Sequence, residues 1–243
     1  MRIVGFMSDI VKSTAKNLKW KTLRYMLAHD TGWRLRRHFF SHPLKYGWAF
    51  IKSLVKSKSF VRDGNFFLYN IDSVEEFELL LSDKKSLLVV GFSYCQKPLD
   101  CPCGRFTTEC MYDSDNQACH QCFIGEAINA LPDDGVVPLV ITTANYIGDN
   151  IFRIVHENPD KNVIFLITSC ELALTMFGDW GNMVNVKGIG VRLRDSTCKT
   201  FKAFEASEKG IKPSLTTIDD NAKEDILRLI QVYGARTIPR YMD

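Results

Sequence analysis

Six of the eight cysteines lie between residues 95 and 122, and they are the side chains in this chain best suited to chemistry. The six are Cys95, Cys101, Cys103, Cys110, Cys119 and Cys122, and the other two are Cys170 and Cys198. So many closely spaced thiols exceed the ordinary use of free cysteine as a small buried hydrophobe. Clustered thiols act as metal ligands, as redox groups or as disulfides.

The expected compartment decides between these chemistries. The opening segment lacks the uninterrupted apolar core of roughly 7 to 15 residues that a signal peptide needs, and no small-residue cleavage site follows it. We therefore expect a cytoplasmic protein, in which disulfides are rare and grouped thiols usually bind metal. The sequence favours a metal or iron-sulfur site over disulfides or inert thiols.

The spacing within the cluster suggests a set of metal ligands. Cys119 and Cys122 form a CxxC unit, which is a chelating pair, and Cys101 and Cys110 complete a first set of four. Cys103 follows Cys101 by only two residues, so we assign it as a bystander or a replacement ligand. Four thiolates suit an iron-sulfur cluster or a tetrahedral zinc ion, and the spacing does not choose between them.

Alternating strand and helix patterns beyond residue 62 indicate the scaffold that positions these cysteines. Short apolar or β-branched runs predict strands at 87–92, 136–142, 163–168, 186–193 and 214–218. Helical patterns lie at 73–81, 119–131, 145–157, 170–177, 197–209 and 219–233. This rhythm predicts a three-layer α/β domain with a mainly parallel sheet over residues 63–243.

The predicted strands give three other cysteines a shared location. Cys95, Cys170 and Cys198 each follow a predicted strand. Ligands of open α/β sheets bind outside the carboxyl ends of the strands, so these three cysteines are expected to converge there as cofactor ligands. They predict a second iron-sulfur cluster at the carboxyl edge of the sheet.

Residues 1–62 differ from the rest of the chain in charge. They hold 14 Lys or Arg and two acidic residues, so their balance is 14 − 2 = +12, whereas residues 63–243 hold 17 basic and 26 acidic residues, or 17 − 26 = −9. We expect a basic, helical N-terminal extension that ends near residue 62. No nucleic-acid-reading motif accompanies this charge.

Residues 44–58 of the extension predict a basic amphipathic helix. The apolar residues that recur at helical spacing are Leu44, Trp48, Ile51 and Val55, and the lysines on another face are Lys45, Lys52 and Lys56. Such a helix suits the headgroup region of an anionic membrane, which would make the protein peripheral at the inner face. The alternatives are that the apolar stripe docks on the main domain, or that the helix binds RNA or a protein partner.

The order of the cysteine motifs resembles that of a known family. A cysteine after the first predicted strand, Cys101-Pro102, Cys110, a CxxC before a helix, Cys170-Glu171 and Cys198 with Thr200 together resemble the prokaryotic family catalogued as domain of unknown function 116. The resemblance covers residues 86–205 and implies a cysteine-rich, iron-sulfur or other metal-binding domain of unassigned activity, often preceded by a membrane-associated extension. The chain departs from the family pattern at His120, where glycine is more usual, at the added Cys103 and in the long spacer 111–118.

These observations lead to one main hypothesis and two alternatives. The main hypothesis is a cytoplasmic protein with one or two iron-sulfur clusters that acts as an oxidoreductase or an accessory protein with a redox partner. The first alternative is a non-enzymatic zinc module whose extension binds a membrane or a protein partner. The second is a thiol-disulfide enzyme that uses the CxxC at a helix start.

Overall fold

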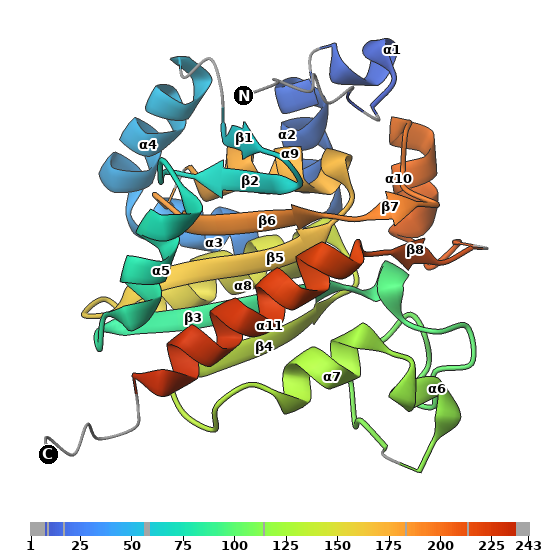
Figure 1. Ribbon diagram of the computed structural model, residues 1–243. Coiled ribbons are helices and arrows are strands. Elements are labelled where there is room, and N and C mark those ends of the chain that lie inside the picture. The colour runs from blue at the N-terminus through green and yellow to red at the C-terminus, as the bar shows by residue number, and fades with distance from the viewer. Residues whose placement is uncertain are drawn as a thin grey trace, which may run out of the picture.

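A six-stranded sheet forms the centre of the protein (Figure 1). The computed structural model describes residues 8, 10–16, 18–55, 59–113, 115–182, 184–212 and 214–236. In these ranges the sheet has the order β1-β2-β6-β5-β3-β4, and its strands are β1 (Val61–Asp63), β2 (Phe66–Tyr69), β3 (Ser86–Ser93), β4 (Val136–Ile141), β5 (Asn162–Ser169) and β6 (Lys187–Arg192). Strands β6, β5, β3 and β4 are parallel, and the β1–β2 hairpin adds an antiparallel edge. The predicted α/β class with a mainly parallel sheet is confirmed.

Helices cover both faces of the sheet. Because the central strands are buried on both sides, their sequences are continuous apolar runs. Helices α5 (Val74–Ser82), α7 (Phe123–Asn129) and α11 (Asp220–Ala235) lie on one face, and α8 (Ala144–Glu157) and α9 (Glu171–Gly181) lie on the other (Figure 1). The first face buries Phe77 and Ile226 against the sheet, and the second buries Phe165 and Phe177. Each face therefore has its own apolar core.

Four N-terminal helices pack outside α8 and α9. They are α1 (Lys12–Ala15), α2 (Leu18–His29), α3 (Arg34–Ser41) and α4 (Pro43–Val55). Met26 and Leu35 share a third buried cluster with Phe152 and Trp180, and the Asp30 carboxylate starts α3 by accepting hydrogen bonds from two of its backbone N–H groups. None of the helices in the described ranges is long and apolar enough to cross a bilayer. Residues 1–7, 9, 17 and 56–58 of the predicted extension lie outside the described residues.

Two predicted elements differ from the observed ones in how the chain is arranged. The helix predicted over 119–131 is broken into α6 (Gln117–His120) and α7, because Cys122 adopts an extended backbone and becomes the N-cap of α7. The strand predicted over 214–218 is reduced to β8 (Thr216–Thr217), which pairs with β7 (Arg194–Asp195) outside the main sheet. Strand β2 already pairs with the free edge of β6, which leaves no position there for another strand.

The strand order creates a crevice at the carboxyl edge of the sheet. From β3 the chain passes through the 3-10 turn η1 (Tyr94–Gln96) and a long loop to α7 on one face, whereas from β5 it passes directly to α9 on the other. Neighbouring parallel strands whose connections diverge in this way open the usual ligand-binding crevice of α/β proteins. Helix α10 (Phe201–Ser207), shorter than the helix predicted over 197–209, lines one side of it with Phe204 and Ser207.

Candidate functional site

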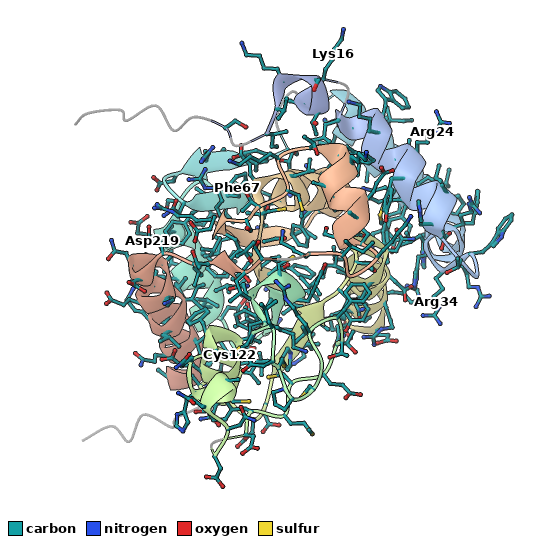
Figure 2. All side chains as sticks on the ribbon, turned by 90° about the vertical axis from the view of Figure 1, so that its right-hand side faces the viewer. Lys16, Arg24, Arg34, Phe67, Cys122 and Asp219 are labelled. Atoms are coloured by element: carbon teal, nitrogen blue, oxygen red, sulfur yellow. The ribbon has the colours of Figure 1, made fainter. Side chains whose placement is uncertain are left out.

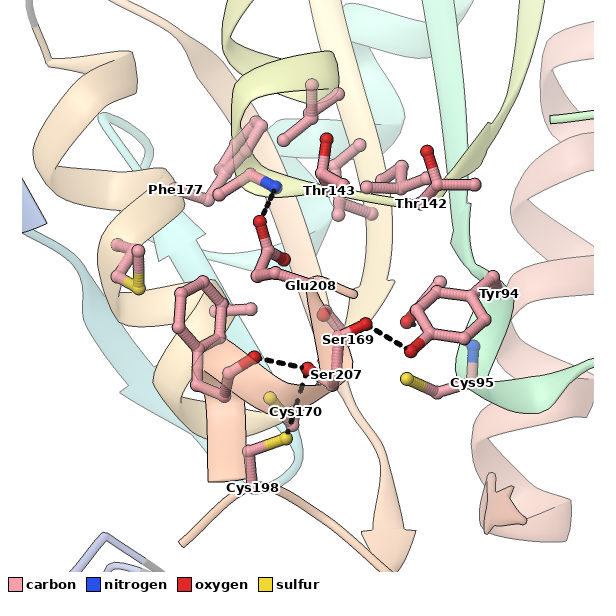
Figure 3. A pocket seen from close by; sticks show the side chains of 18 of the residues that line it. Tyr94, Cys95, Thr142, Thr143, Ser169, Cys170, Phe177, Cys198, Ser207 and Glu208 are labelled. Carbon is pink, nitrogen blue, oxygen red and sulfur yellow. Dashed lines mark hydrogen bonds between the residues drawn. The ribbon is translucent and has the colours of Figure 1, made fainter. Parts of the chain in front are cut away.

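All three cysteines predicted as cofactor ligands line one pocket in this crevice, which we call the thiol pocket (Figure 3). Cys95 follows β3, Cys170 follows β5, and Cys198 lies on the segment between β7 and α10. The cavity measures about 70 Å³. All three side chains are buried, so the fold brings together thiols that are as far apart in sequence as Cys95 and Cys198, at 198 − 95 = 103 residues.

Cys170 and Cys198 line the same pocket (Figure 3). The interaction between their two side chains lowers the pKa of Cys198 and raises that of Cys170. The Lys212 ammonium lies 3.6 Å from the Cys198 sulfur and lowers its pKa further by charge attraction. Cys198 is therefore the cysteine of this pair that more readily becomes a thiolate.

Cys95 faces the same cavity from another wall (Figure 3). Burial raises the pKa of its thiol. Its backbone carbonyl accepts a hydrogen bond from Arg105 at 3.3 Å, and the same guanidinium donates to the carbonyl of Ser214 at 2.7 Å and to that of Lys212. Arg105 thereby joins the wall that carries Cys95 to the segment that carries Lys212.

A buried carboxyl group lies at the far side of the thiol pocket. Glu208 accepts hydrogen bonds from the Ala144 backbone N–H at 2.7 Å and from the Tyr25 hydroxyl at 3.2 Å (Figure 3). Desolvation raises the pKa of Glu208 to about 7. This carboxyl therefore exchanges a proton near neutral pH, and it joins helix α2 to the base of the pocket.

The other five cysteines line a second, smaller pocket. Cys101, Cys103 and Cys110 come from the loop after η1, and Cys119 and Cys122 flank the break between α6 and α7. We call residues 97–122 the cysteine loop and this cavity, of about 10 Å³, the loop pocket. Figure 2 labels Cys122 at the lower end of the molecule, away from the N-terminal helices that carry Arg24 and Arg34.

A buried lysine holds the cysteine loop. Lys97 is 1% exposed, and its ammonium donates to the carbonyls of Gly104 and Glu109, both at 2.8 Å, and to the Thr107 hydroxyl at 2.9 Å. The backbone N–H of Met111 donates to the Cys103 sulfur at 3.3 Å. The fold of this loop therefore depends on one buried cation that replaces a regular hydrogen-bond ladder.

The loop pocket has the donor chemistry of a soft-metal site. Burial raises the pKa values of Cys101 and Cys122, and neighbouring cysteines contribute to both shifts. All eight cysteines are free thiols. In the part of the chain that the structure describes, no three His, Cys, Asp or Glu side chains already stand in a metal-ligating arrangement. The residues thus fit a thiolate-bound group in type and number, and bound metal would draw them into its coordination geometry.

Sequence reasoning did not identify the charged residues of either pocket. No periodic pattern marks the loops that contain Lys97, Arg105 and Lys212. In the sequence, Glu208 resembles an ordinary acidic residue at the end of a helix. The nearest signal was the proximity of Lys97 and Arg105 to clustered cysteines. Their roles depend on contacts with residues up to 109 positions away, which a local pattern does not encode.

No protein family, no curated protein and no solved structure matches this chain. The resemblance to domain of unknown function 116 stays a prediction. The residues of the two pockets are therefore the features that bear on its function.

Proposed function

We propose that the protein binds an iron-sulfur cluster through the cysteines of its loop pocket. The observation that carries this proposal is that five free thiols from three short segments line one cavity beside the carboxyl edge of the sheet. Cytosolic thiols that gather in this number usually ligate metal.

The first ligand set is Cys101, Cys110, Cys119 and Cys122, since four thiolates are the ordinary ligands of iron-sulfur clusters. Cys103 is the replacement ligand. Its sulfur accepts a hydrogen bond from the Met111 backbone N–H, and hydrogen bonds to ligand sulfurs tune the properties of a bound cluster. When bound, the cluster supplies one-electron transfer.

Lys97 supports this site electrostatically. Its charge lowers the pKa of Cys101 and opposes the effect of burial on that thiol. A buried cation offsets part of the negative charge that four thiolates would bring to the site. The same side chain orders the backbone between Gly104 and Glu109.

Metal analysis of the full-length chain purified without oxygen tests the proposal. We expect brown protein with iron and acid-labile sulfide, and a reduced sample with an electron paramagnetic resonance signal. The C119S/C122S variant should lose most of the iron, whereas L79E, which changes an exposed residue of α5, should retain it. Unchanged iron in C119S/C122S would remove the CxxC pair from the site.

A structural zinc ion is the alternative occupant of the loop pocket. The small cavity, about 10 Å³, favours it, since this is the space of one water-sized atom. A zinc ion would hold the loop together without redox chemistry. The protein would then be colourless and contain one zinc ion per chain. The same metal analysis separates the two occupants.

A second cluster held by Cys95, Cys170 and Cys198 stays a prediction. Three thiols supply one ligand fewer than the usual four, which would leave one iron open to substrate. Iron above four atoms per chain that falls in a C95S variant would support it.

A second candidate function is binding to an anionic membrane surface through the basic N-terminal helices. Leu44, Trp48 and Ile51 on α4 are 89%, 71% and 54% exposed, so this apolar stripe does not dock on the α/β domain. Lys45 and Lys52 beside it are also exposed. An apolar stripe with a tryptophan and flanking lysines suits an anionic interface.

Vesicle flotation tests the membrane proposal. The full chain should float with phosphatidylserine vesicles at low salt, and W48E should float several-fold less, while L79E should behave as wild type. Equal recovery of W48E and wild type would contradict the proposal. The iron-sulfur proposal fits a cytoplasmic protein, and the membrane proposal adds a peripheral location at the inner face of the membrane.

A further inference from the structure

An apolar groove lies between helices α2 and α3, and its floor includes Phe152 of α8 and Trp180 of α9. These two side chains and that of Met26 are buried, whereas Trp33 and Phe40, which also line the groove, are 63% and 66% exposed. The groove is therefore open to solvent. Its volume is about 450 Å³, within the roughly 300 to 1,000 Å³ that is usual for small-molecule sites.

The walls of the groove are hydrocarbon. Among the described residues that line it, every side chain except that of Arg36 is apolar or aromatic. A polar group placed against these walls would lose its hydration without gaining a hydrogen bond, whereas an apolar group gains from burial. The body of a ligand that fits this groove is therefore a hydrocarbon.

Arg36 supplies a fixed cation at the groove. Its guanidinium donates to the backbone carbonyl of Leu27 at 2.6 Å and lies 4.7 Å from the centre of the Trp33 ring, and both partners line the groove. Trp33 has a left-handed backbone with a φ of 59°, which a bulky residue seldom adopts. Backbone strain of this kind is typical of residues held in place at a binding site.

The guanidinium keeps donors for an anionic ligand. Arg34, labelled in Figure 2, lies 3.5 Å from the Asp149 carboxylate, whereas Arg36 forms no ion pair within the described ranges. Because the Leu27 carbonyl accepts from only one end of the guanidinium, N–H groups of Arg36 remain for a carboxylate.

We propose that this groove binds a long-chain fatty acid, with its alkyl chain between α2 and α3 and its carboxylate on Arg36. A hydrocarbon cavity with one cation matches a ligand that has an apolar body and one anionic end. None of the described residues that line the groove is a cysteine or belongs to α4. The site is therefore independent of the metal centre and of membrane binding through α4.

Isothermal titration of the full-length chain with dodecanoate, below its micelle concentration, tests the proposal. Wild type should bind one equivalent, about 15-fold more tightly than decanoate, since each buried methylene contributes about fourfold. R36Q should bind dodecanoate at least about tenfold more weakly, because it loses a charge-assisted hydrogen bond. Arg37 is exposed and does not line the groove, so R37Q is the matched control and should bind as wild type.

Two further measurements separate recognition of the carboxylate from loss of structure. Wild type should prefer dodecanoate to dodecanol by at least about tenfold, and R36Q should lose this preference while it still binds dodecanol. F40E should weaken the binding of both ligands, because it places a charge on an apolar wall, and its exposed position makes unfolding an unsuitable explanation.

Four results would overturn the proposal. Wild type that does not bind dodecanoate, or equal affinities of R36Q and R37Q, would remove the fatty-acid site. Tighter binding of dihexanoyl phosphatidic acid than of dodecanoate would assign the groove to a phospholipid, and a dimer that F40E dissociates would assign it to a second copy of this chain. W48E and C119S/C122S should bind dodecanoate as wild type does, so failure of the membrane or metal proposal would leave this site intact.

Discussion

Replacement of Lys97 by methionine should open the cysteine loop while the α/β domain stays folded. Methionine is close to lysine in length and carries no charge or donor. The change removes three close hydrogen bonds from a charged donor, those to Gly104, Thr107 and Glu109. The carbonyl and hydroxyl oxygens that accepted them would remain facing an apolar side chain.

The magnitude follows from these contacts. A hydrogen bond to a charged group contributes about 1.5 to 3 kcal/mol, and an acceptor left unsatisfied in a buried position costs about 1 to 3 kcal/mol. The loop can move its carbonyls into water, so the full sum is not reached, and we expect a loss of about 3 to 5 kcal/mol in the local stability of the loop. This corresponds to a fall of at least about a hundredfold in amide protection.

Hydrogen exchange measured by mass spectrometry is the appropriate assay, because it resolves local opening from global unfolding. Peptides that cover residues 101–111 should lose their protection in K97M, whereas peptides from β3 and β5 should not. K97M should also bind less metal. Lys84 is exposed, so K84M is the matched control and should resemble wild type. Full protection of residues 101–111 in K97M would refute the role given to the buried ammonium.

Three further changes test other contacts. The raised pKa of Glu208, about 7 against an ordinary 4.5, means that the folded state keeps a proton that the unfolded state loses as pH rises. The free energy of unfolding of wild type should therefore fall by up to about 3 kcal/mol relative to that of E208Q between pH 4.5 and 7. Urea titrations that give the two proteins the same dependence of unfolding free energy on pH would contradict this. R105M should lose about 2 kcal/mol of stability, since Arg105 donates to the backbone carbonyls of Lys212 and Ser214, and wild-type stability would contradict this. W48E should change the free energy of unfolding by less than about 0.5 kcal/mol, because Trp48 is exposed, and a larger loss would mean that this face of α4 is buried.

The sequence predicted the central strands well because their apolar runs are long and are buried on both faces. Strand β3 was expected at 87–92 and occupies Ser86–Ser93. The β1–β2 hairpin was not predicted, since strands of three and four residues are too short for a periodic pattern.

The location of the cysteines after strands was the most useful signal for the site. Parallel strands end at a common edge, so Cys95 and Cys170 were expected near each other and line one pocket. The break at Cys122 was not expected, because the residues around it are compatible with a continuous helix and the packing of the loop decides otherwise. The role of Lys97 depends entirely on the folded path of the loop, which has no sequence period.

The iron and acid-labile sulfide content of the anaerobically purified chain, compared with that of C119S/C122S, tests the central claim most directly. We predict iron and sulfide in about equal amounts in the wild type and a loss of most of both in the variant. Wild-type protein without bound metal, or a variant that keeps its full iron content, would contradict the assignment of the loop pocket as a metal centre.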